Sequence, residues 1–104
     1  MNKEKAVKIG QKKLIGKVTE DEKNEVQALF ERKNGLTELF QALASMSVDE
    51  QNNLYNRIVK DMSDVTAKMK KWWKEKSANY KWENVAGYKW EIDFDTCEIY
   101  LVKE

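Results

Sequence analysis

Ser47-Val48-Asp49-Glu50 interrupts a long stretch of helical sequence and decides the fold of this chain. Between positions 19 and 78 apolar residues recur every three to four positions, with no proline and a single glycine, Gly35. A serine followed three residues later by glutamate is a capping box, in which each side chain bonds the backbone N–H of the other residue and so starts a helix. We therefore predict two long helices joined by a turn of about two residues, which forces them to run antiparallel.

The first predicted helix begins at another capping box, Thr19-Glu20-Asp21-Glu22, whose carboxylates suit the positive end of a helix dipole. Its apolar stripe stays in phase across Gly35, where continuing a helix costs only about 1 kcal/mol. We therefore expect one unbroken helix over 20–45. In the second helix, apolar residues at 55, 58, 62, 65, 69 and 72 follow the three-four spacing of a coiled-coil seam.

After residue 80 the pattern changes to alternation. Apolar and charged residues alternate strictly over 88–95, and a second stretch rich in β-formers follows Asp95-Thr96, from 97 to 102. This arrangement predicts a β-hairpin. The motif Tyr80-Lys81-Trp82-Glu83 recurs as the start of the first strand, so residues 80–83 form either a third strand or, if the second helix continues to Asn79, no strand at all.

The N-terminal segment is basic, with six lysines against Glu4 in residues 1–17. Two Ile-Gly pairs, at 9–10 and 15–16, fit the arms of a short hairpin, and a loose basic tail over 1–14 is the alternative. The predicted fold class is α+β: a long antiparallel helical hairpin with a small C-terminal antiparallel β-hairpin or meander, with or without an N-terminal strand. At 104 residues we expect a single domain.

Composition narrows the chemistry. The chain has no histidine and one cysteine, Cys97, so the ordinary Cys–His nucleophile is excluded and the thiol reads as a small hydrophobe. Glu91, Asp93 and Asp95 lack the spacing of a calcium loop, and we expect no metal and no cofactor. The net charge is +1, which provides no field to attract nucleic acid or a membrane. No apolar segment has the length of a signal peptide core or a membrane span, which predicts a cytoplasmic protein.

The aromatic residues after position 72 are the candidate contact residues, because a core this small cannot bury all of them and partly exposed aromatics mark protein contacts. The candidates are Trp73, Tyr80, Trp82, Trp90 and Tyr100. We predict a non-enzymatic domain that binds a protein or peptide. Two alternatives stay open: a nucleic-acid-associated protein using Lys68–Lys76, although no arginine there offers bidentate phosphate contacts, and a structural homo-oligomer, as a dimer of hairpins forming a four-helix bundle.

Four stretches of the chain also suggest a family. They are Ile15-Gly16-Lys17-Val18-Thr19-Glu20, Leu29-Phe30-Glu31-Arg32-Lys33-Asn34-Gly35-Leu36, Lys71-Trp72-Trp73 and Trp90-Glu91-Ile92-Asp93-Phe94-Asp95-Thr96-Cys97-Glu98-Ile99. Together they resemble small accessory proteins of bacterial CXXX-repeat peptide modification systems, over most of residues 15–102. The resemblance implies a role beside a radical-SAM-type enzyme that modifies a cysteine-repeat precursor peptide, and it transfers no catalytic residues.

Overall fold

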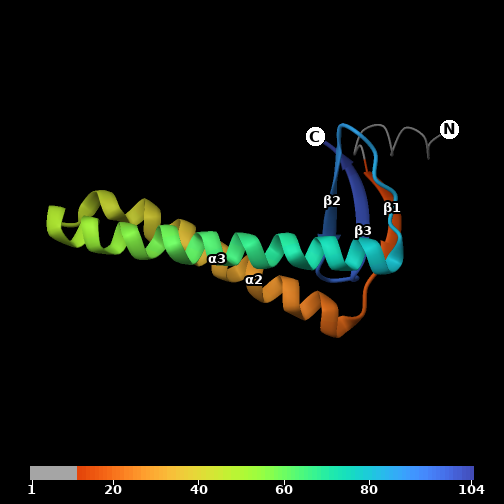
Figure 1. The fold of residues 1–104 in the computed structure, drawn as a ribbon, viewed down its shortest axis with the longest axis horizontal. Helices are drawn as coiled ribbons and strands as arrows, with labels where there is room; N and C mark the ends of the chain where they lie inside the picture. The colour runs from red at the N-terminus through yellow and green to blue at the C-terminus, as the bar shows by residue number, and fades with distance from the viewer. Residues whose placement is uncertain (1–11) are drawn as a thin grey trace. The chain divides into compact units, whose positions relative to one another are not determined.

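The computed structural model describes residues 12–104 and has the element order β1, α2, η1, α3, β2, β3 (Figure 1). The predicted α+β class is confirmed. The chain divides into two compact units, Met1–Asn24 with Lys76–Glu104, and Glu25–Glu75. We call the described part of the first the sheet unit and the second the hairpin unit. The predicted extended arm at 9–10 lies outside the described residues.

Both helices start at the predicted caps. Helix α2 spans Glu20–Ala42 and helix α3 spans Val48–Tyr80. At the first cap the Thr19 N–H donates to Glu22 Oε1 at 2.9 Å, and the Glu22 N–H donates to Thr19 Oγ1 at 3.1 Å. Ser47 and Glu50 form the same reciprocal pair at 3.2 and 3.3 Å. The local sequence alone therefore positions both helix starts.

Helix α2 passes through Gly35 without a break, as predicted. It ends at Ala42, three residues before the predicted end, because Leu43–Ser45 tighten into a 3-10 turn. The Met46 N–H closes this turn on the Leu43 carbonyl at 3.0 Å. Short 3-10 turns are a common way to satisfy carbonyl groups at the end of an α-helix.

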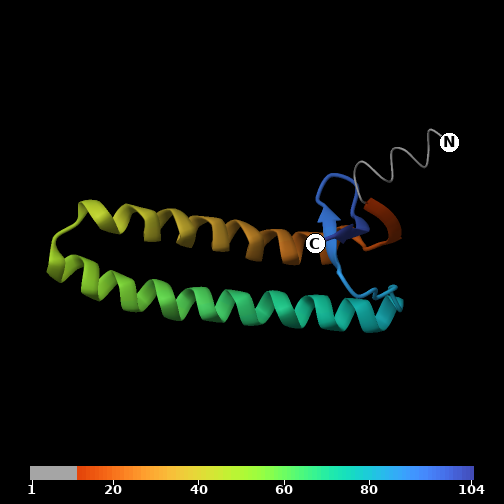
Figure 2. The ribbon, with the colours of Figure 1, turned by 90° about the horizontal axis from the view of Figure 1, so that it is seen from above.

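In the hairpin unit, α2 and α3 run antiparallel (Figure 2), and buried apolar residues form one seam. Of the six positions predicted for the α3 seam, every second one is buried, namely Ile58, Val65 and Trp72. Tyr55, the first predicted position, is 47% exposed. Tyr55 instead meets the Phe40 ring at 6.0 Å between centroids. On α2 the buried residues are Val26 and Leu36. The seam is therefore narrow.

The sheet unit contains three antiparallel strands in the order β1-β3-β2, with β3 in the centre (Figure 1). These strands are β1 (Lys12–Lys17), β2 (Tyr88–Asp93) and β3 (Glu98–Lys103). Trp90 pairs with Leu101 and Ile92 with Ile99. Ile99 is fully buried and Leu101 is 3% exposed. The predicted C-terminal hairpin is thus confirmed, and an N-terminal strand joins it.

Of the two alternatives for residues 80–83, the third strand is wrong and the continuing helix is correct. Helix α3 continues to Tyr80, and Lys81 then adopts a left-handed conformation with φ of 56°. The Trp82 N–H reaches back to the Ser77 carbonyl at 3.1 Å, the hydrogen bond that closes a helix around a left-handed residue. This closure turns the chain sharply, so the repeated Tyr-Lys-Trp-Glu motif has two different structures. Within residues 12–104, neither α2 nor α3 contains an apolar stretch of the length that a membrane span requires.

Candidate functional site

Three of the five candidate aromatics come together in the sheet unit. The Tyr80 ring lies parallel to the Trp82 ring, with a 5° interplanar angle and 5.5 Å between centroids. Trp90 meets Trp82 at 6.1 Å and 65°. Offset-stacked and edge-to-face pairs at these separations are favourable beyond the area that they bury. We call Tyr80, Trp82 and Trp90 the aromatic stack.

Trp82 forms the base of the aromatic stack. It is only 8% exposed, so the expectation that it is a surface contact is wrong. Its ring lies directly on Gly16 of β1, where a Cβ atom would stand 2.5 Å from Trp82 Nε1. Glycine at this position permits the close approach. Trp82 therefore contributes to the core of the sheet unit and supports the two outer rings.

Polar contacts hold the outer rings in position. The Trp90 Nε1–H donates to the Glu83 carbonyl at 2.8 Å, and Lys13 Nζ donates to Glu83 Oε1 at 2.9 Å. The Tyr80 hydroxyl donates to Glu22 Oε1 at 2.5 Å. Because these bonds already fix the two rings, the rings would lose little conformational freedom in any further contact.

Glu22 links the start of α2 to the end of α3 within the sheet unit. Burial by itself raises the pKa of Glu22, but hydrogen bonds from Thr19 and Tyr80, together with Lys76 Nζ at 3.8 Å, bring the pKa below its usual value. The same bond to Glu22 raises the pKa of the Tyr80 hydroxyl. A charged Glu22 and a protonated Tyr80 therefore stabilise each other.

The exposed part of the stack has a neighbour that the sequence interpretation missed. Tyr80 is 40% exposed and Trp90 is half-buried, while Tyr88 at the start of β2 is 37% exposed. Tyr88 and Trp90 are two residues apart in one strand and so share a face of the sheet. The alternation over 88–95 contained this signal.

The other two candidates lie elsewhere. Tyr100 sits between Ile99 and Leu101 on β3, so its side chain is on the sheet face opposite to Trp90, which pairs with Leu101. Its hydroxyl donates to Glu98 at 2.9 Å, which raises the pKa of Tyr100, and Lys12 Nζ lies 5.3 Å from its ring centroid. Trp73 belongs to the hairpin unit, where it meets Trp72 edge-on at 4.9 Å. Tyr100 and Trp90 therefore do not share a face of the sheet unit.

Cys97 lies in the four-residue turn between β2 and β3. It has φ of 64°, is 7% exposed, and its Sγ lies 3.7 Å from Glu20 Oε2. Burial, followed by the negative charge of Glu20, raises the pKa of the thiol. A buried thiol held protonated is a poor nucleophile. Among residues 12–104, no group of three or more His, Cys, Asp or Glu side chains could hold a metal ion.

The basic-aromatic run Lys68–Lys76 does not present a continuous face of lysine and tryptophan. Trp72 is 5% exposed. Lys71 pairs with Glu75 at 4.0 Å, and Lys76 pairs with Glu22 at 3.8 Å. Comparison with protein-family models, with curated proteins and with solved structures finds no match for this chain.

Proposed function

We propose that this chain is a non-enzymatic accessory domain that binds a protein or peptide through the outer rings of the aromatic stack, Tyr80 and Trp90. The observation that carries the proposal is a set of partly exposed aromatic rings fixed by stacking on a buried tryptophan and by hydrogen bonds. Rigid tyrosine and tryptophan side chains dominate the binding energy of protein interfaces, because they provide large contact area at small entropic cost.

The chemistry of the stack favours an uncharged, apolar or sulfur-containing partner segment. Sulfur atoms make favourable contacts with aromatic rings, worth about 0.3–1.5 kcal/mol each. The family resemblance points to a cysteine-repeat precursor peptide, and this chemistry is compatible with it. The domain would then hold the peptide while a separate enzyme modifies it.

A non-enzymatic role is supported by the lack of histidine in the whole chain and by the buried, protonated thiol of Cys97. Nucleic-acid binding has less support, because two lysines of Lys68–Lys76 already pair with carboxylates and Trp72 is buried. A salt titration separates the two functions. Phosphate contacts weaken steeply with added salt, whereas aromatic contacts change little.

The test is a titration of the purified chain with a synthetic, reduced Cys-x-x-x repeat peptide, followed by tryptophan fluorescence and calorimetry. Trp90→Ala and Tyr80→Ala each weaken binding about tenfold or more, as expected for interface hot spots. Tyr100→Ala, on the other sheet face, is the matched control and leaves affinity within about twofold, since it lies outside the contact. Thermal melts confirm that each variant is folded.

A single-stranded oligonucleotide and a peptide with serine in place of cysteine complete the experiment. Equal affinity for the serine peptide removes the sulfur preference but keeps the peptide-binding function. If the chain binds the oligonucleotide and this affinity falls steeply with added salt, the proposal is contradicted. So does peptide binding that Tyr100→Ala weakens as much as Trp90→Ala does.

A further inference from the structure

The hairpin unit leaves a large amount of apolar surface exposed. Its exposed large apolar residues, each between 42% and 71% accessible, are Phe30, Leu39, Phe40, Val48, Tyr55 and Val59. Two helices packed along a single seam cannot cover them, because each helix turns only one stripe toward the other. Small helical units of this kind commonly gain the missing burial by oligomerisation.

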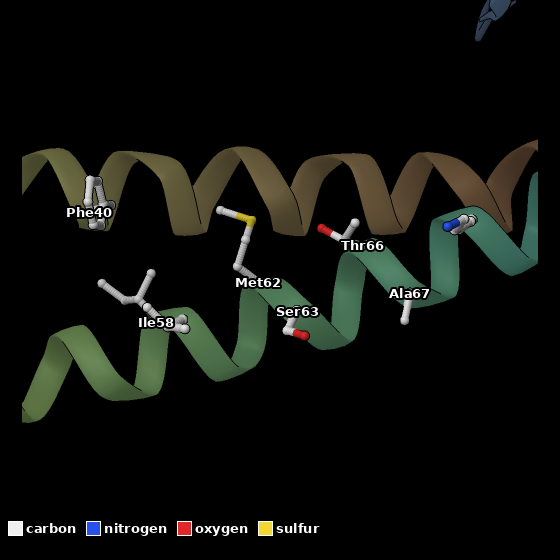
Figure 3. A pocket seen from close by; sticks show the side chains of 8 residues that line it. Phe40, Ile58, Met62, Ser63, Thr66 and Ala67 are labelled. Carbon is white, nitrogen blue, oxygen red and sulfur yellow. The ribbon is translucent and has the colours of Figure 1, made fainter.

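One side of the hairpin unit contains a groove of about 650 Å³. Phe40 of α2 and seven residues of α3 line it, and Met62 projects from α3 toward α2 (Figure 3). The seven α3 residues are Ile58, Val59, Met62, Ser63, Thr66, Ala67 and Lys70. Lys70 is the one charged residue in this lining.

We call the side of the hairpin unit that contains the groove the groove flank. On the opposite side of α3, a row of charged side chains runs along the helix. Arg57, Asp61, Asp64 and Lys68 are spaced by four, three and four residues and so form one ridge along the helix. Arg32 of α2 pairs with Asp61 at 3.6 Å. This contrast identifies the groove flank as the side of the hairpin unit suited to association, because buried charges are costly and buried apolar groups are not.

The groove is complementary to itself. Along the α3 lining, the larger apolar side chains Val59 and Met62 precede the small side chains of Ser63, Thr66 and Ala67, and the long side chain of Lys70 follows them. A second copy of α3 running antiparallel, about a two-fold axis between positions 62 and 63, places the long Met62 side chain against the small Ser63 side chain at the centre of the interface. In a two-fold interface every such contact occurs twice.

In this register, facing positions are equally distant from the axis. Val59 faces Thr66 of the second copy and Met62 faces its Ser63. Tyr55 faces Lys70 of the second copy, a pairing in which an ammonium group can lie over an aromatic ring. No carboxylate is among the groove-lining residues, so closing the groove buries no acidic group of the lining.

The area also suits a dimer. The α3 segment 48–75 is about 42 Å long at 1.5 Å per residue, and two helices side by side are about 20 Å wide. The outline of the helix pair therefore covers about 840 Å², which is large enough to hold the roughly 800 Å² of accessible surface that each partner buries in a standard specific interface.

We propose that the groove flank of the hairpin unit is a homodimer interface, in which α3 packs antiparallel against α3 of a second copy about a two-fold axis at Met62 and Ser63. This inference is independent of the peptide contact proposed for the sheet unit, and each can fail without the other.

Cross-linking tests the register. Ser63 lies next to the proposed axis, whereas Asn53 is exposed on α3 and outside the groove lining. Ser63→Cys gives a covalent dimer with a short thiol cross-linker, while Asn53→Cys and the wild type, with only buried Cys97, do not. Equal yields from Ser63→Cys and Asn53→Cys contradict the proposal.

The mass in solution tests the interface itself. Sedimentation from low micromolar to submillimolar concentration shows wild-type chain at twice the monomer mass, and Thr66→Glu shifts it to the monomer. Asn53→Glu, which adds the same charge outside the groove, stays dimeric, and both substitutions favour helix formation. A wild type that is monomeric at every concentration overturns the proposal, and so does a Thr66→Glu variant that stays dimeric. Binding of an acidic helical peptide in the groove of a monomeric wild type also overturns it.

Discussion

The sheet unit and the hairpin unit bury their apolar residues in different ways. The sheet unit collects Val18, Trp82, Ile99 and Leu101, all at most 8% exposed, from segments far apart in the sequence. The hairpin unit buries residues along one seam between two neighbouring helices, and six of its other large apolar side chains are exposed. Long-range pairing closes a small core in the sheet unit, whereas a single helix pair leaves large apolar side chains exposed.

The largest expected effect comes from one change made in each unit. Ile99→Ala in the sheet unit costs about 4 kcal/mol of unfolding free energy, because Ile99 is fully buried and the cavity cannot collapse. Ile58→Ala costs about 2 kcal/mol, because Ile58 lines the open groove and the space fills with water. Urea unfolding of both variants at low protein concentration measures the difference. Equal costs would remove the proposed contrast between the units.

Two glycine substitutions sharpen the contrast with opposite signs. Gly16→Ala lowers stability by about 1–3 kcal/mol, because its Cβ would stand 2.5 Å from Trp82 Nε1. Gly35→Ala meets nothing within 4 Å in helix α2 and raises stability by about 1 kcal/mol. Thermal melts followed by circular dichroism provide both values. A neutral Gly16→Ala would show that Trp82 does not need the close approach.

The smallest effect concerns pH. The pKa of Glu22 is lower in the folded chain than its usual value of 4.5, so its charged form contributes stability above that value and the contribution is lost as pH falls through the folded pKa. Glu22→Gln therefore reduces the acid sensitivity of the near-ultraviolet dichroism of the aromatic stack. Glu50→Gln is the matched control, because Glu50 also has a lowered pKa, from its bonds to Ser47, but belongs to the hairpin unit. If Glu50→Gln changed the acid sensitivity of this dichroism signal and Glu22→Gln did not, the proposed role of Glu22 would be contradicted.

Local signals in the sequence predict much of this fold. Thr19 and Ser47 start their helices through partners three residues away, and the alternation over 88–95 produces the β-hairpin. The end of α3 was harder to predict, because Lys81 adopts the left-handed conformation that glycine usually takes at this position. That single residue decides that 80–83 is not a strand.

The candidate site depended on contacts that local patterns do not contain. The burial of Trp82 depends on Gly16, which is distant in sequence. The separation of Tyr100 from Trp90 depends on the register across a four-residue turn in which Cys97, again not a glycine, has positive φ. The residue types were sufficient to select Tyr80 and Trp90 as candidate contacts, but only the fold shows which rings support the stack and which are exposed.

Hydrogen exchange measured by residue at low and at high protein concentration tests the contrast between the units most directly. We expect amide protection in β1, β2 and β3 to be the same at both concentrations, because the core of the sheet unit forms within one chain. Protection over 55–70 of α3 rises with concentration as the groove is covered. Protection that is independent of concentration along α3, or that rises in the strands instead, would contradict the account.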